Sequence, residues 1–225
     1  MPRNGRIRDQ RRQELIRATI AVIARRGYSG TTVARVAEKA RVSVGLMNFY
    51  FSSKDLLFRD TFKYLSQEYD RTWQRNLEPA AADPRARLKT MIESYFDPLI
   101  FTPEKLAVWF TFWSDAELRD RYRAVATRLE HKYLKALGRE ITRILAARRE
   151  PRGDATAIVA GLSAMIDGFW LQALLDSRGF ERAAAVQACL AFLEMRLQPS
   201  ANPSRKSWPL IRARRPVLAG RPSRG

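Results

Sequence analysis

The chain holds one histidine and one cysteine, so few of its side chains could take part in covalent or metal chemistry. His131 lies in the charged run "RLEHKYLKAL", which is typical of a solvent-exposed helix surface, and Cys189 has no second cysteine with which to form an internal disulfide. A zinc site needs several Cys, His or carboxylate ligands, and neither residue has them at a suitable spacing. The sequence also lacks a glycine-rich phosphate loop and a nucleophile paired with a base. We therefore expect no enzyme activity, no metal and no cofactor.

Two pairs of side chains have the types and spacing needed to bind an organic cation. Trp109 and Trp113 are spaced i, i+4, and Asp167 and Trp170 are spaced i, i+3, so each pair shares one face of a predicted helix. Aromatic ring faces attract a quaternary ammonium ion, which has no N–H donor, and a carboxylate adds charge attraction. These four residues are the predicted ligand-binding set. The alternative, that they form an ordinary helical core in which Asp167 pairs with an arginine, stays open.

The segment around residues 41–54 could read DNA. A short predicted helix over 44–50 follows a predicted helix over 33–40 through a tight connection, which is the pattern of a helix-turn-helix. Such a helix fits the major groove, where Asn48 and Tyr50 can hydrogen-bond and Gly45 lets the two backbones approach. Lys54 begins the next helix and can reach a phosphate there together with free backbone N–H groups. The alternative is a three-helix corner with no such role.

This part of the chain resembles the DNA-binding domain of TetR-family repressors. The matching pieces, over about residues 10–57, are Arg-Gly-Tyr, Thr-Thr-Val, Val-Ala-Glu-Lys-Ala, Val-Ser-Val-Gly and Ser-Lys-Asp-Leu-Leu. The resemblance implies that Thr32 and Lys54 bind phosphates and that residues 43–50 lie in the groove. The sequence departs from the family around residue 41 and over residues 48–50. Arg41 replaces the usual glycine, Asn48 stands where a tyrosine is common, and Tyr50 stands where a histidine is frequent. The predicted DNA-binding set is Thr31, Thr32, Ser43, Val44, Gly45, Asn48, Phe49, Tyr50 and Lys54.

Two later stretches, residues 106–123 and 161–176, resemble the ligand-binding and dimerisation domain of the choline-responsive BetI-type subgroup of this family. The pieces that carry the resemblance are Trp-x-x-x-Trp and Ile-Asp-Gly-x-Trp. It implies a repressor that leaves its operator when a small molecule binds, with choline or a related quaternary ammonium compound as one candidate, in control of glycine-betaine synthesis. The alternatives are a TetR-type regulator with an unrelated ligand and a non-specific basic DNA-binding protein.

The elements that would position these residues are all helical. Apolar periodicity, capping residues and Asp-Pro or Thr-Pro signals predict about nine helices and no strand. The predicted helices cover about 8–26, 33–40, 44–50, 54–78, 84–97, a segment from 103, 115–148, 154–178 and 180–197. No uninterrupted apolar run reaches the ~18 residues of a membrane span, and the first ten residues lack the apolar part of a secretory signal. With a single cysteine, these features predict a cytoplasmic protein without a membrane partner.

The positive charge is concentrated at the two ends of the chain. The net charge is +18; residues 1–26 carry eight Arg against two acids, and residues 199–225 carry seven Lys or Arg and no acid. Such an excess favours a nucleic-acid partner, although a solvated basic end without a specific partner is the alternative. We predict a helix-turn-helix domain with a basic arm over 1–54, a ligand-binding and dimerisation domain over 55–198, and a basic disordered tail over 199–225. If the tail adds DNA affinity, its deletion flattens the salt dependence of binding.

Small and apolar residues near the end of the chain predict a homodimer. Ala157, Gly161, Ala164 and Gly168 lie on one face of the predicted helix 154–178, and small residues let another helix approach closely. Helix 180–197 has an apolar stripe ending at Leu197, and together the two helices would form a four-helix bundle across a two-fold axis. The predicted interface is Gly161, Ala164, Gly168, Val186, Leu190 and Leu193. A dimer would bring two reading helices to successive major grooves of a palindromic double-stranded operator. The alternative is that both stripes face the core of their own chain.

Overall fold

A computed structural model describes residues 3–79, 82–147 and 153–198. Within these ranges every regular element is an α-helix, which confirms the all-α prediction. The helices are α1 (Arg3–Gly30), α2 (Val33–Ala40), α3 (Val44–Tyr50), α4 (Lys54–Leu77), α5 (Pro84–Tyr95), α6 (Pro103–Ser114), α7 (Ala116–Ala147), α8 (Gly153–Leu175) and α9 (Arg182–Leu197). The predicted tail over 199–225 lies outside the described residues.

Capping side chains explain most helix starts. The N-cap side chain accepts a hydrogen bond from a backbone N–H of the first turn in α2 to α6, at Thr32, Ser43, Ser53, Asp83 and Thr102 respectively. Such a bond satisfies one of the N–H groups that have no partner within the helix, and proline at the first position of α5 and α6 has no N–H to satisfy. These local signals are why the predicted boundaries of α2 and α3 are confirmed to the residue.

The first helix differs from its prediction at both ends. It begins at Arg3 instead of near residue 8, because the intervening arginines are compatible with helix. Gly27 has φ 65 and ψ −175, a conformation that glycine adopts readily, so the regular helix breaks there as predicted. Residues 28–30 then form a last turn before the N-cap of α2.

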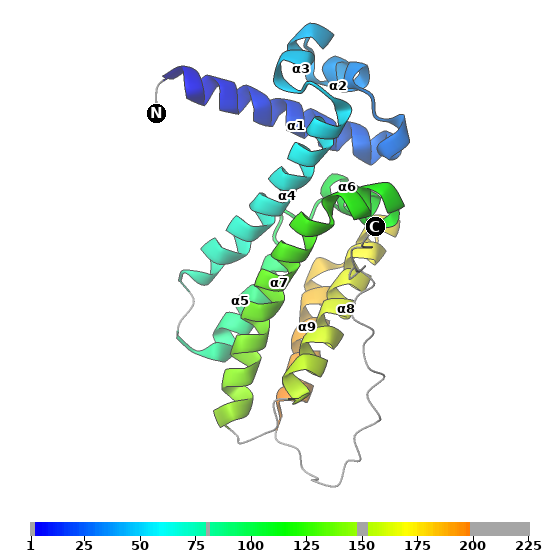
Figure 1. Ribbon diagram of the computed structural model, residues 1–225. Coiled ribbons are helices and arrows are strands. Elements are labelled where there is room, and N and C mark those ends of the chain that lie inside the picture. Colours follow the sequence, from blue (N-terminus) through cyan, green and yellow to red (C-terminus); the bar gives the residue numbers. More distant parts are fainter. Residues whose placement is uncertain (1–2, 80–81, 148–152, 199–225) are drawn as a thin grey trace, which may run out of the picture.

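The helices form a head and a body (Figure 1). Helices α1, α2 and α3 make the head at one end, and α4 runs from the head along the body. Helices α5, α7, α8 and α9 extend along the body, whereas α6 lies next to the head and packs against α1. Helix α4 belongs to both parts and α6 contacts α1, so these two helices connect the head with the body. The predicted domain boundary after residue 54 falls in the first turn of α4.

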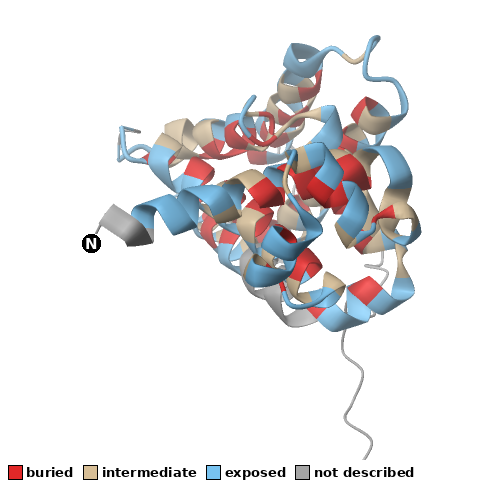
Figure 2. Cartoon of the chain, turned by 90° about the horizontal axis from the view of Figure 1, so that it is seen from above, coloured by how far each residue is buried: buried red, intermediate tan, exposed pale blue. Residues whose placement is uncertain are grey.

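The buried side chains form one continuous core that joins head and body. It runs from Leu15 and Met47 in the head through Phe62 of α4 to Ile141 of α7 and Leu193 of α9. Viewed from the head end, buried residues occupy the middle of the molecule and exposed residues its outside (Figure 2). Head and body therefore share one core and are not separate packing units.

Candidate nucleic-acid interface and aromatic cluster

Helix α3 presents most of its side chains to solvent. Its N-terminus is capped by Ser43, whose hydroxyl accepts a hydrogen bond from the backbone N–H of Leu46 at 3.1 Å. Met47 is fully buried and holds the helix on the head. The other predicted reading residues lie at the surface or close to it: Val44, Gly45, Asn48 and Phe49 are exposed, and Tyr50 is half-buried. The structure therefore brings these predicted residues together on one helix, and DNA contact by them stays a prediction.

Arg12 of α1 holds the end of α3 against α4, a role that sequence reasoning did not assign. Its guanidinium lies 4.7 Å from the ring centroid of Phe51, donates to the backbone oxygen of Tyr50 at 3.4 Å, and forms an ion pair with Asp60. In the sequence, Arg12 is one of eight arginines in a basic run, and nothing local marks its partner 48 residues away. Arg12 is a structural residue of the head.

The two threonines before α2 differ in exposure. Thr32 is exposed, and its hydroxyl accepts from the backbone N–H of Arg35 at 3.3 Å. Thr31 is fully buried, its hydroxyl donates to the backbone oxygen of Gly27 at 2.7 Å, and its N–H donates to the oxygen of Tyr28. Both donors of Thr31 are therefore used inside the head in this structure, and its contact with DNA stays a prediction.

Lys54 lies at the corner where α1 ends and α4 begins. Its ammonium donates to the backbone oxygen of Tyr28 at 3.1 Å and lies 4.3 Å from the centroid of the Tyr28 ring. The edge of the same ring packs against Phe58, with a centroid separation of 4.8 Å. Lys54 thus fixes the angle between α1 and α4 in this structure, while its backbone N–H is at the positive end of α4.

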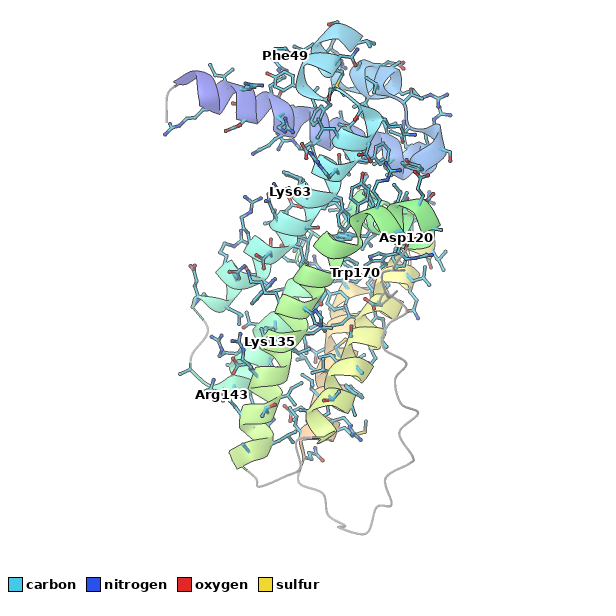
Figure 3. All side chains as sticks on the ribbon, in the orientation of Figure 1. Phe49, Lys63, Asp120, Lys135, Arg143 and Trp170 are labelled. Carbon is cyan, nitrogen blue, oxygen red and sulfur yellow. The ribbon has the colours of Figure 1, made fainter. Side chains whose placement is uncertain are left out.

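The three predicted ligand-binding tryptophans lie in one cluster inside the body. Trp109 and Trp113 of α6 have ring centroids 6.0 Å apart, and Trp113 is stacked on Trp170 of α8 with a centroid separation of 6.3 Å and an interplanar angle of 19°. Tyr95 and Phe101 contact Trp170 edge-on, and Figure 3 places Trp170 just below α6. Two helices far apart in sequence therefore supply one aromatic cluster.

The two polar groups that α8 contributes near this cluster, the indole N–H of Trp170 and the carboxylate of Asp167, differ in burial. Trp170 is buried, and its Nε1 has no hydrogen-bond partner within the part of the chain that the structure describes. Asp167 lies on the exposed side of α8. Burial is the main cause that raises the pKa of Tyr69, followed by the neighbouring Tyr95 and Tyr133, and the negative charge of Asp167 makes a smaller contribution in the same direction. A buried indole N–H without an acceptor is unusual in a folded protein and marks a place where a ligand oxygen would be stabilised.

The residues of the predicted dimer interface on α8 and α9 differ in exposure. Ala164 and Gly168 are exposed as predicted, and they continue into Leu171 and Leu175, which are 42% and 77% exposed. A Cβ on Gly161 would meet the Phe192 ring of the same chain at 2.9 Å. On α9, Leu193 and Leu197 are buried and Val186 and Leu190 half-buried, so much of this stripe packs against its own chain, and its contact with a partner stays a prediction. The exposed face of α9 instead carries Ala184, Ala191 and Met195.

Segment Ala155–Leu175 is the one stretch of the described residues that is long and apolar enough to cross a membrane by length and composition. An interior helix of a water-soluble protein meets the same criterion, and α8 packs against α6, α7 and α9. Only 28% of its apolar window is buried in a single chain. The helix therefore has an apolar surface that needs a cover.

Comparison with known proteins agrees with both halves of the structure. Residues 15–61 match the profile of bacterial regulatory proteins of the tetR family, and residues 84–198 match "BetI-type transcriptional repressor, C-terminal". The chain belongs to the TetR family of transcriptional regulators. It is 33% identical over 201 residues to the HTH-type transcriptional regulator BetI of Paraburkholderia phymatum. The aligned region covers 89% of this chain and 100% of that protein. Another BetI, from Paraburkholderia xenovorans, is 31% identical over 195 residues and covers 87% of this chain and 97% of its own.

Solved structures agree with this membership. A transcriptional regulator from Pseudomonas aeruginosa PAO1 superimposes with a TM-score of 0.72 at 28% identity, over 84% of this chain and 91% of its own. A regulator from Saccharomonospora viridis, solved in complex with choline, superimposes with a TM-score of 0.69 at 22% identity, over 83% of this chain and 96% of its own. The second likeness concerns the fold alone. TetR-family proteins of the BetI type are transcriptional regulators and not enzymes, so α1 to α3 form a DNA-binding head.

Proposed function

We propose that the chain is a cytoplasmic transcriptional repressor that binds a palindromic operator as a homodimer and leaves it when a small molecule binds. The proposed effector is a quaternary ammonium compound, with choline as the first candidate, and the controlled genes would be those of glycine-betaine synthesis. An unrelated effector, or non-specific binding by a basic protein, is the competing function.

The tryptophan cluster is the observation that carries the effector proposal. Trp109, Trp113 and Trp170 offer ring faces to a soft cation, each worth about 0.5–2 kcal/mol. The unpartnered Nε1 of Trp170 could donate to a hydroxyl oxygen of choline, and Asp167 on the same helix supplies a negative charge. The choline complex of the Saccharomonospora viridis protein, which has a similar fold, supports the same ligand class.

The position of the cluster supports release from DNA. In this structure Trp113 lies directly on Trp170, so a cation between the two rings has to separate α6 from α8. Helix α6 packs against α1 of the head, and its displacement therefore moves the head. In a dimer, such a movement changes the distance between the two α3 helices, and a tenfold loss of operator affinity needs about 1.4 kcal/mol of coupling.

Fluorescence anisotropy with a labelled fragment of the gene's own upstream DNA tests the proposal. We expect the wild-type protein to bind this fragment more tightly than a scrambled fragment, and choline to weaken the binding. The matched ligand control is 3,3-dimethyl-1-butanol, which has the shape of choline but a carbon atom in place of the charged nitrogen. Because ring faces attract the charge, this neutral compound should leave binding unchanged.

A protein variant completes the design. Trp113→Leu should keep operator binding and lose most of the choline response, since Trp113 is the ring stacked on Trp170. Selective DNA binding that ignores choline would reject choline but keep the repressor. Equal affinity for the upstream and scrambled fragments would favour a non-specific basic protein.

A further inference from the structure

The reading helix has an unusual surface for a protein of net charge +18. The sequence of α3, Val-Gly-Leu-Met-Asn-Phe-Tyr, contains no charged side chain. Three of its large apolar side chains are exposed instead: Phe49 at 66%, Val44 at 45% and Leu46 at 36%. The side-chain carboxamide of Asn48 is the one strong hydrogen-bonding group among the exposed residues of this helix.

Helix geometry directs Phe49 outward. Met47 is fully buried, and two residues further along the helix corresponds to a rotation of about 200°, so Phe49 points away from the head. One turn before Phe49 stands Gly45, where an added Cβ would meet only the Ser43 hydroxyl, at 3.8 Å. Figure 3 shows Phe49 beside α3 at the outer end of the molecule. Base edges in a major groove could therefore contact the Phe49 ring, because Gly45 has no side chain to obstruct them.

The ring of Phe49 is held in place. The Arg8 guanidinium of α1 lies 5.5 Å from its centroid, and the Tyr50 ring packs edge-on at 5.3 Å. A phenylalanine has only two side-chain torsions, so these two contacts fix its orientation at a small cost in conformational entropy. The exposed cations near the helix come from neighbouring segments and not from α3 itself: Arg8 belongs to α1, and Lys39 and Arg41 belong to α2 and its C-cap.

The major groove offers few partners to such a surface. Thymine carries a C5-methyl group, the apolar feature there, and adenine presents N6–H and N7, which match an asparagine carboxamide. Guanine is most often read by arginine or lysine, and α3 has neither. We propose that this reading face selects A·T base pairs, with Phe49 packed on a thymine methyl group and Asn48 hydrogen-bonded to an adjacent adenine. The inference rests on the proposed operator binding and makes Phe49 and Asn48 specificity-determining residues.

Atomic changes in the DNA test this proposal without disturbing the protein. Selection from a random duplex pool with the full-length wild-type protein provides the operator. Each thymine of one half-site is then replaced by uracil, which removes only the C5-methyl group. We expect one or two replacements to weaken binding about fourfold each, the effect of exposing one methyl-sized group, and about 15-fold when both half-sites are changed. Replacing the adjacent adenine by 7-deazaadenine should also weaken binding.

The protein variants show which side chain reads which atom. Phe49→Ala should bind thymine and uracil operators equally, whereas Phe49→Leu should retain part of the difference. Asn48→Ala should bind adenine and 7-deazaadenine operators equally. Leu99→Ala, which truncates a 49% exposed leucine outside the head, is the matched control and should behave as wild type.

The outcomes separate this inference from the proposed function. Selective operator binding that no uracil replacement weakens would overturn the thymine contact, and selection of G·C pairs beneath α3 would overturn the A·T preference as a whole. Failure to select any sequence would reject the operator function itself and the inference with it.

Discussion

Among the described residues, Arg41 is the non-glycine residue with a left-handed backbone, at φ 56 and ψ 47. It ends α2, and its N–H donates to the backbone oxygens of Ala37 and Glu38. An L-residue with a Cβ in this region is strained by about 1–2 kcal/mol, while glycine is not. Glycine also makes the unfolded chain more flexible, which opposes part of the gain.

We predict that Arg41→Gly stabilises the protein by about 0.5–1 kcal/mol and weakens DNA binding, because it relieves the strain but removes an exposed cation beside α3. Urea unfolding and a salt titration of operator affinity measure the two effects. Arg41→Ala is the control, since it removes the same charge and keeps the Cβ. Equal stability of the two variants would contradict the strain argument, and an unchanged salt slope would show that Arg41 contacts no phosphate.

Individual residues also differ in how far their contacts can be predicted from the sequence. Ser43 and Thr32 cap α3 and α2 by binding N–H groups that are their neighbours in sequence, so local signals are enough to place these helix starts. The role of Arg12 depends on how distant segments pack, and no local pattern contains that information. Arg12 in a basic run has the same neighbours whether it meets solvent, a phosphate or Asp60.

At the scale of elements, a chain of contacts joins the tryptophan cluster to the first turn of α4. Trp109 packs edge-on against Phe62 with centroids 5.2 Å apart, and Phe62 packs against Tyr122 of α7 at 5.8 Å. The Tyr122 hydroxyl donates to the Asp55 carboxylate at 3.0 Å. Burial, and secondly this hydrogen bond, raise the pKa of Tyr122, so the hydroxyl stays a donor at neutral pH. The network connects the proposed effector site with the start of α4, directly beneath the head.

We predict that Tyr122→Phe keeps operator binding within about twofold and reduces, by about three- to tenfold, the factor by which the effector weakens it. The lost hydrogen bond ties α7 to α4, and one such bond contributes about 1 kcal/mol. Anisotropy titrations with and without effector provide the measurement. Tyr64→Phe is the matched control, because its hydroxyl on α4 contacts Glu68 of the same helix. An unchanged effector response in Tyr122→Phe would show that this contact does not transmit the signal.

The Asp55 carboxylate also predicts a pH dependence. The Arg121 guanidinium donates to Asp55 at 2.5 Å and, with Tyr122, holds the pKa of the carboxyl below its ordinary value of 3.8. A depressed pKa stabilises the fold above that ordinary value, and the stabilisation is lost as the pH falls through the folded-state pKa. Because both side chains are over 40% exposed, the effect stays below about 1 kcal/mol.

The expected result is that Asp55→Asn is slightly less stable than wild type at about pH 7, and that the difference shrinks below about pH 4 and disappears once the pH lies below the folded-state pKa of Asp55. Urea unfolding of the wild type and of Asp55→Asn across this range supplies the comparison. A difference that persists in acid would assign the effect to packing instead of charge.

At the scale of the whole molecule, periodicity finds the apolar faces of α9 but does not say which of them packs within the chain. Helix α9 has an apolar stripe through Val186, Leu190 and Leu193 and a second one through Ala184, Ala191 and Met195. Leucines mark a buried face, but a sequence cannot tell burial within a chain from burial between chains. The structure separates them, because the first stripe packs inside and Met195 is 66% exposed.

The exposed stripe of α8 predicts what a single charge does to assembly. Leu171 lies on this face with Ala164 and Gly168, and in a two-fold arrangement each copy meets the same region of its partner. Leu171→Glu removes two apolar contacts per dimer, each worth about 1 kcal/mol because Leu171 is 42% exposed in the single chain, and it places two like charges in the interface. We expect a dimer dissociation constant at least about 100-fold higher in sedimentation velocity, and a parallel loss of operator affinity because two linked reading heads bind far better than one. Leu99→Glu, outside α8 and α9, should remain dimeric. A Leu171→Glu protein that stays dimeric and binds its operator as wild type would place the interface elsewhere.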